Sequence, residues 1–168
     1  MSVDWAEVYR TTFEDLVRFL HRKVWDADRA QDLAQETFVR ALDHEPDNPR
    51  AWLFTVAGNL ARDEARAAIR RREHLTLIKS EAATREPAPD PAEELEREQR
   101  MQRVRGALDR LSERDRDVLL LWDAGLDYAE IAAETGLAQG AIGTTLARAR
   151  RRLVEAYGEM EDRDVAHR

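Results

Sequence analysis

The stretch DYAEIAAETGLAQGAIGTTLARARRR, residues 127–152, predicts two helices joined by a tight turn. Asp127 and Glu130 match a capping box, so a short helix is expected to begin directly after Asp127. Gly136 is expected to end that helix, and a longer helix rich in alanine and arginine follows from Gln139 to Tyr157. A short helix, a turn with glycine and a second helix of this kind form a helix-turn-helix layout.

The residues upstream extend this motif into a small helical module. A helix is expected from Ala92 to Leu111. Ser112 is a good N-cap for another helix, which runs to Asp123 and is ended by Gly125. Together with the helix-turn-helix motif, these helices predict a domain over residues 95–158.

The N-terminal part of the chain predicts a second helical module. Apolar residues at helical spacing indicate a helix from Trp5 to Val24. A capping box of Asp28 with Gln31 opens the next helix, which runs to Leu42. The segment NPRAWLFTVAGNLARDEARAAIRRR, residues 48–72, then gives a long helix, because its asparagine is a good N-cap and proline suits the first helical position.

Residues 79–94 separate the two modules. They contain prolines, alanines and acids without an apolar period, so they predict a flexible linker between a domain at 1–78 and the domain at 95–158. The acidic tail 159–168 is expected to be frayed and solvated. The predicted fold class is therefore all-α, with a three-to-four-helix domain and a helix-turn-helix domain joined by a linker.

The composition excludes several function classes. With no cysteine among 168 residues, the chain forms no disulfide and no thiolate metal site. Its histidines show no ligand spacing, and it lacks both a glycine-rich phosphate loop and a nucleophile–base pattern. We therefore expect no metal, no cofactor and no catalysis. No segment resembles a membrane span or a signal peptide, so a cytoplasmic protein is expected.

Positive charge is concentrated on two of the predicted helices, although the net charge is −7. Ala61 to Arg72 holds five arginines against two acids, and Gln139 to Val154 holds four arginines and no acid. An acidic chain adheres poorly to nucleic acid as a whole, so any such contact should be confined to these two helices.

The long helix predicts a polar stripe beside its core-facing stripe. Leu53, Val56 and Leu60 share the core stripe. The neighbouring stripe contains Trp52, Thr55, Asn59, Arg62, Asp63, Arg66 and Arg70. Arginines hold phosphates, an aromatic group receives an unstacked base and an amide reads its edge, so this stripe suits a single strand opened from a duplex. The alternative interpretation is a solvated charged face beside a core.

The other tryptophans, Trp5, Trp25 and Trp122, lie on apolar stripes and are expected in the core.

Three motifs, taken in order, resemble a bacterial extracytoplasmic-function (ECF) sigma factor. The first is DLAQETFVRAL at 32–42, and the second is the long-helix segment at 48–72. The third, after the linker, is LDRLSERDRDVLLLWDAGLDYAEIAAETGLAQGAIGTTLARARRRL at 108–153. Each motif alone is moderately specific, but their order and spacing across the linker make the resemblance strong.

The resemblance implies a two-domain sigma subunit that binds core RNA polymerase, at the β′ clamp and the β flap, and selects promoter DNA. Contacts with the clamp would come from Asp32, Gln35, Glu36, Phe38 and Arg40. The polar stripe of the long helix would read and hold the non-template strand of the minus-ten element. Major-groove contacts with the minus-thirty-five element would come from Thr144, Arg148, Arg150, Arg151 and Arg152. An anti-sigma factor is a further expected partner.

The chain departs from the family pattern at four positions. In the long helix, TVAGNLA stands where the family often has RIARNLA, so Thr55 and Gly58 replace arginines. In the last helix, GAIGTTLARAR stands for GTVKSRLARAR, so Gly143 and Thr145 replace cations. We therefore expect recognition of the upstream element to depend on phosphates and DNA shape.

Two other functions are compatible with parts of the sequence. A sigma-like decoy would bind an anti-sigma factor or polymerase without initiating transcription, and the missing arginines favour it. A free-standing dimeric repressor would use the last helix alone, but it leaves the first 78 residues unexplained.

Overall fold

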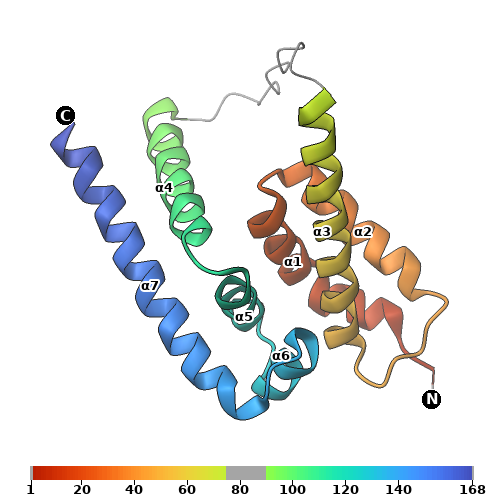
Figure 1. The fold of residues 1–168 in the computed structure, drawn as a ribbon. Coiled ribbons are helices and arrows are strands. Elements are labelled where there is room, and N and C mark those ends of the chain that lie inside the picture. The colour runs from red at the N-terminus through yellow and green to blue at the C-terminus, as the bar shows by residue number, and fades with distance from the viewer. Residues whose placement is uncertain (1, 75–89, 168) are drawn as a thin grey trace.

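The computed structural model describes residues 2–74 and 90–167, and the regular structure of these residues is entirely helical (Figure 1). The helices are α1 (Trp5–Val24), α2 (Ala27–Ala41), α3 (Pro49–His74), α4 (Pro91–Asp109), α5 (Glu113–Asp123), α6 (Tyr128–Thr135) and α7 (Gln139–Ala166). The all-α fold class is confirmed. Most of the predicted linker lies outside the described residues.

Helices α1, α2 and α3 pack together as the first module. Leu16 and Leu20 of α1, Leu33 of α2, and Leu53 and Phe54 of α3 are almost completely buried. Phe19 meets Phe54 edge to face, with 5.1 Å between ring centroids. Burying one large apolar side chain contributes about 1.5–3 kcal/mol, so this shared core fixes which face each helix turns to solvent.

The starts of α2 and α3 show which capping residues the chain uses. Asn48 caps α3 as predicted, since its side-chain oxygen accepts from the Ala51 amide at 3.1 Å. The predicted capping box of Asp28 is wrong, because Asp26 caps α2 and accepts from the Arg29 amide at 2.9 Å. Trp25 explains the shift: it takes a left-handed conformation, φ 56°, at the end of α1, and the chain can begin α2 immediately afterwards.

The second module consists of α4, α5, α6 and α7, with α6 and α7 forming the helix-turn-helix. The capping box of Asp127 and Glu130 is confirmed, with both reciprocal hydrogen bonds at 2.8 Å. Gly136 ends α6 with φ 72°, a left-handed conformation that glycine adopts without strain. Ser112 caps α5 by accepting from the Asp115 amide at 3.2 Å.

Two predicted boundaries of this module are wrong. The tail from residue 159 is helical, since α7 continues to Ala166, and residues 91–94 belong to α4 rather than to the linker. The reason is that α4 and α7 lie side by side (Figure 1). Arg103 pairs with Asp164 at 3.1 Å and Arg110 with Glu159 at 2.5 Å, so the C-terminal part of α7 gains partners that the sequence pattern does not reveal. The start of α4 is capped by Asp90, which accepts from the Ala92 amide at 2.9 Å.

The two modules touch through α1 with α5 and through α3 with α6. In Figure 1, α5 and α6 lie between the α1–α3 bundle and the N-terminal half of α7. The helix-turn-helix is therefore placed directly beside the long helix α3.

The capping box gives a first prediction. Replacing Asp127 with alanine should lower the free energy of unfolding by about 1 kcal/mol, because the Glu130 amide loses its acceptor at the start of α6. Urea unfolding followed by circular dichroism measures the change. Asp162→Ala, which removes an exposed carboxylate from α7, is the matched control and should leave stability unaltered. Equal effects of the two substitutions would contradict the role of the cap.

Candidate nucleic-acid interface

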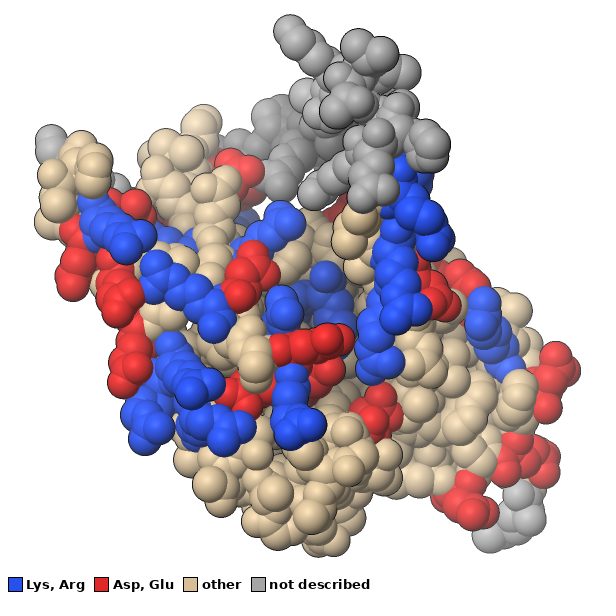
Figure 2. All heavy atoms as spheres, viewed as in Figure 1, with Lys and Arg blue, Asp and Glu red and all other residues tan. Residues whose placement is uncertain are grey.

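One side of α3 presents a row of exposed polar side chains. The row comprises Asn59, Arg62, Asp63, Arg66 and Arg70. The opposite side of the helix carries the buried residues Leu53, Ala57 and Leu60. Their packing in the core orients the helix so that the polar row faces solvent. Figure 2 shows cationic side chains running along α3 in this way. The structure thus brings most of the predicted minus-ten residues together on one exposed face.

Asn59 and Arg62 interact within this row. The Asn59 side-chain oxygen accepts a hydrogen bond from Arg62 Nη1 at 3.0 Å. Asn59 also carries two amide N–H donors at this exposed position. Arg62 therefore orients its neighbour in addition to carrying charge.

Trp52, at the N-terminal end of the same face, belongs to an aromatic cluster. Its ring lies 6.3 Å from that of Trp5 and 5.0 Å from that of His44, between centroids, and it is half-buried against the core. The Trp52 ring is therefore held in place by its neighbours at one end of the polar row.

Thr55 and Gly58 face the second module. The Thr55 hydroxyl forms a hydrogen bond with the carboxylate of Glu134 in α6. Gly58 is buried at the same place, and a Cβ there would stand 3.8 Å from Glu134 Oε1. Burial raises the pKa of Glu134, because the charged form loses solvent, and the Thr55 bond opposes that shift. Of the predicted strand-binding stripe, Thr55 is thus engaged with α6, whereas Asn59 and the residues that follow it on the stripe remain exposed.

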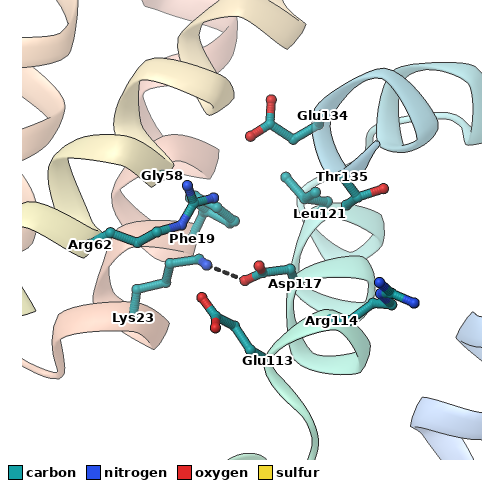
Figure 3. A pocket seen from close by; sticks show the side chains of 10 residues that line it. All are labelled: Phe19, Lys23, Gly58, Arg62, Glu113, Arg114, Asp117, Leu121, Glu134 and Thr135. Carbon is teal, nitrogen blue, oxygen red and sulfur yellow. Dashed lines mark hydrogen bonds and ion pairs between the residues drawn. The ribbon is translucent and has the colours of Figure 1, made fainter. Parts of the chain in front are cut away.

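A cleft of about 450 Å³ opens beside this contact, between α1, α3, α5 and α6 (Figure 3). Lys23 and Arg62 line it from the first module. Glu134 and Asp117 line it from the second, and Asp117 forms an ion pair with Lys23. The charges of the two modules are complementary across the cleft.

In the second module, a buried carboxylate organises the arginines of α7. Asp115, with a side chain 1% exposed, accepts from Arg148 Nη2 at 2.6 Å and Nε at 3.2 Å, and from Arg152 Nη1 at 3.2 Å. The hydrogen bond from Arg148 holds the pKa of Asp115 below its ordinary value, although burial opposes this effect. Arg148 and Arg152 are therefore held against the module, and Arg148 keeps its Nη1 edge for an outside acceptor.

The remaining predicted residues of α7 are arranged around an aromatic pair. Thr144 and Arg151 are exposed, and the Arg150 guanidinium lies over the Trp122 ring at 5.7 Å. Trp122 was expected in the core but is 38% exposed, because Val118 and Leu121 fill the core positions of α5. Its ring contacts Tyr128, with 5.4 Å between centroids.

Sequence reasoning missed Tyr128 as part of this surface. A Cβ at Gly143 would lie 3.5 Å from the Tyr128 ring, so the tyrosine covers the place where the family usually has a cation. The available signal was a glycine on the recognition helix together with an aromatic residue directly after the α6 cap.

The predicted polymerase contacts all lie on α2, and all but Phe38 are exposed or partly exposed. Asp32, Gln35 and Arg40 are exposed, and Arg40 pairs with Glu36 at 2.7 Å. Phe38 is placed differently, since it is only 8% exposed and packs against the rings of Tyr9 and Phe13. We therefore correct its assignment from contact residue to core residue.

Two apolar side chains that the prediction of polymerase contacts omitted, Val39 of α2 and Leu42 directly after its end, are 65% and 66% exposed. Val39 lies off the apolar stripe that packs into the core, which is the signal that could have identified it, whereas Leu42 continues that stripe and was expected on the core face.

Comparison with known proteins agrees with this division into two modules. Residues 8–71 match the family described as sigma-70 region 2, and residues 101–153 match sigma-70 region 4. The chain is 41% identical over 134 residues to the ECF RNA polymerase sigma factor EcfG of Rhodopseudomonas palustris, covering 76% of this chain and 71% of that protein. The chain is an ECF sigma factor of the sigma-70 family.

Other relatives support the same family. The RNA polymerase sigma factor YlaC of Bacillus subtilis is 29% identical and covers 86% of each chain. The sigma factor RpoE in complex with the anti-sigma factor NepR, from Bartonella quintana, has a similar structure. Its TM-score is 0.65 at 28% identity, over 91% of this chain and 96% of that chain.

In this sigma factor, α1–α3 form region 2, and α5–α7 carry most of region 4. The last part of α7, beyond residue 153, and the start of α4 lie outside both matched regions. Within residues 2–74 and 90–167, no helix combines the length and apolar character needed to cross a membrane. The same residues contain no cluster of histidine and carboxylate groups suited to a metal ion.

The buried carboxylate gives a second prediction. Asp115→Asn should lower the free energy of unfolding by about 1–3 kcal/mol at neutral pH, because two arginines lose their charged acceptor. The folded-state pKa of Asp115 lies below its unfolded value, so its contribution is present above the unfolded pKa and is lost as pH falls through the folded one. Urea unfolding at neutral and acidic pH should therefore show the two proteins converging in acid. A constant difference across that range would count against the ion pair.

Gly58 gives a third prediction. Replacing it with alanine should raise the free energy of unfolding by about 0.5–1 kcal/mol, because alanine is the better helix former and the new Cβ meets only ordinary contacts. Thermal and urea unfolding measure the change. Gly136→Ala, at a position with φ 72°, is the contrasting variant and should destabilise the protein. A loss of stability at position 58 would show that α6 and α3 approach more closely than described.

Proposed function

We propose that this ECF sigma factor binds core RNA polymerase and directs initiation at specific promoters, with α3 holding the non-template strand of the minus-ten element. The observation that carries the proposal is the exposed row from Asn59 to Arg70 on a helix anchored by its buried side. The protein acts by binding, in the cytoplasm, and contributes no catalysis of its own.

On α3 the proposed roles follow from side-chain chemistry. Arg66 and Arg70 bind phosphates, while Asn59 and Asp63 meet the edges of unpaired bases. Arg62 orients Asn59 through their hydrogen bond. Trp52 provides an aromatic wall at one end of the strand path.

In region 4, α7 enters the major groove of the minus-thirty-five element. Thr144 and Arg151 contact DNA from exposed positions, and Arg148 and Arg152 act from the fixed geometry that Asp115 gives them. Arg150 and the aromatic pair beside it extend this surface. With no side chain at Gly143, contact with the backbone and with DNA shape carries much of the affinity.

The polymerase side of the proposal uses α2. Asp32, Gln35, Glu36 and Arg40 provide polar contacts for the β′ clamp, and the exposed apolar residues of the same helix provide a nonpolar centre. Region 4 meets the β flap. The net charge of −7 gives the free chain little affinity for DNA, so promoter binding depends on the polymerase.

An anti-sigma factor is the further partner that we propose. The solved structures similar to this chain include the RpoE–NepR complex, and CnrH with the cytosolic domain of CnrY, at a TM-score of 0.63 and 27% identity. The contacts of Thr55 and Gly58 with α6 give their departure from the arginine pattern a structural reason. The departures at Thr55 and Gly58 therefore do not favour the sigma-like decoy.

Run-off transcription with purified core polymerase tests the function and gives a fourth prediction. The double substitution Arg66→Ala and Arg70→Ala should reduce open-complex formation at least about tenfold, as expected for loss of two phosphate contacts. Arg10→Ala, which removes an exposed arginine from α1, is the control and should initiate normally. Promoters would come from mapping transcription starts after overexpression. Failure of the unaltered protein to initiate at any of its genome's promoters would refute the proposed function.

A further inference from the structure

Two aromatic rings of region 4 lie at the surface rather than in the core. Trp122 of α5 and Tyr128 of α6 are 38% and 39% exposed, and their rings contact each other with 5.4 Å between centroids. Val118, Leu121 and Ile131 fill the core positions of the same two helices. Adjacent exposed rings beside the helix that we assign to DNA indicate a binding surface, since single exposed apolar residues are common but contiguous ones are not.

Tyr128 lies against Gly143 of α7. A Cβ at Gly143 would stand 3.5 Å from Tyr128 Cε2 and 3.6 Å from the hydroxyl oxygen. The head of the phenol therefore lies where a side chain of residue 143 would leave the backbone of α7. Because glycine has no side chain, nothing from this position extends over the ring edge or the hydroxyl.

The neighbours of Tyr128 restrict its movement. Tyr128 is the first residue of α6, directly after Asp127, which forms the capping box with Glu130. Its ring packs on Trp122, and the Arg150 guanidinium lies over the Trp122 ring at 5.7 Å. A side chain held at its backbone and along its ring loses little conformational entropy on binding, so it can serve as a rigid reading group.

The exposed groups of Tyr128 match the major-groove edge of thymine. Thymine presents an apolar C5 methyl group beside the O4 acceptor, whereas guanine presents two acceptors and cytosine presents an amino donor. The ring edge of Tyr128 suits the methyl group, and the adjacent hydroxyl is able to donate to O4. A lysine or arginine at position 143 would instead read the N7 and O6 atoms of guanine.

We propose that Tyr128 is a specificity-determining residue, which reads a thymine of the minus-thirty-five element through the space that Gly143 leaves open. Trp122 positions the ring. The departure at position 143 therefore exchanges a contact with guanine for one with thymine, and base recognition is kept at this position. This inference rests on the proposed function of region 4 and adds the base that it selects.

Substitutions at positions 128 and 143 test the inference in the holoenzyme. Open complexes would be recovered and sequenced from promoters, identified by start mapping, in which every base of the minus-thirty-five element is varied. The unaltered protein should prefer thymine at one base pair, and Tyr128→Phe should reduce that preference about two- to tenfold, as expected for one hydrogen bond. Preferences at the other positions should stay the same. Tyr157→Phe, which removes a hydroxyl from the C-terminal part of α7, is the matched control.

Gly143→Lys provides the reverse test. Its Cβ would meet the Tyr128 ring at an ordinary contact distance, so the fold accommodates the substitution. The lysine should move the preference from thymine to guanine at the same base pair that Tyr128→Phe affects.

A modified base tests the contact with the methyl group. Deoxyuridine in place of the selected thymine removes only the C5 methyl group, and it should lower open-complex formation by the unaltered protein about fourfold, as expected for burial of one methyl group. Tyr128→Phe keeps the ring and should show the same loss. Tyr128→Ala should respond equally to thymine and deoxyuridine, with thermal unfolding as the check that the module remains folded.

The outcomes separate this inference from the proposed function. If the unaltered holoenzyme initiates at no promoter, the proposed function fails and the thymine contact fails with it. If it initiates but Tyr128→Phe weakens every sequence equally, the hydroxyl binds phosphate and base reading by Tyr128 alone is overturned. An unchanged preference in Gly143→Lys, a Tyr128→Phe variant that matches Tyr157→Phe, or no response to deoxyuridine would also overturn it.

Discussion

The structure depends on one constraint, which is that α3 must bury one face in the core while it exposes the other face to solvent. Leu53, Phe54 and Ala57 are completely buried against α1 and α2, and they fix the rotation of the helix about its axis. That rotation, and no property of the arginines themselves, determines that Arg66 and Arg70 face outward. A binding surface on a helix anchored in this way is rigid before its ligand arrives, which lowers the entropic cost of binding.

Electrostatic complementarity inside the molecule explains how an acidic chain carries basic surfaces. Asp115 neutralises part of the charge of α7 from within the module, and Glu64 pairs with Arg29 and Arg71 beside α3. Arg66 and Arg70 of α3 and Arg151 of α7 stay exposed, and these are positions where we propose contact with DNA. Affinity is thus directed to two surfaces while the whole chain avoids non-specific adhesion.

The same complementarity operates between modules. Region 4 places Asp117 and Glu134 against Lys23 and Thr55 of region 2, and Phe19 and Leu121 line the same cleft. The departures at Thr55 and Gly58 belong to this contact, since a long cationic side chain at either position would have to share the space with α6.

The sequence by itself determined the helices, the caps at Asn48, Ser112 and Asp127, and the family, because these features depend on local hydrogen bonding and on the period of apolar residues. The tertiary structure alone decided what each surface side chain touches. Phe38 is core, Trp122 is exposed, and the tail of α7 is ordered by its pairing with α4. The contact of α6 with α3 could not be predicted from the sequence either. It joins two residues 79 positions apart, and no periodic pattern in the sequence relates them. Local sequence patterns determine where a helix begins and ends and which face is apolar, whereas contacts between distant elements depend on their packing in three dimensions.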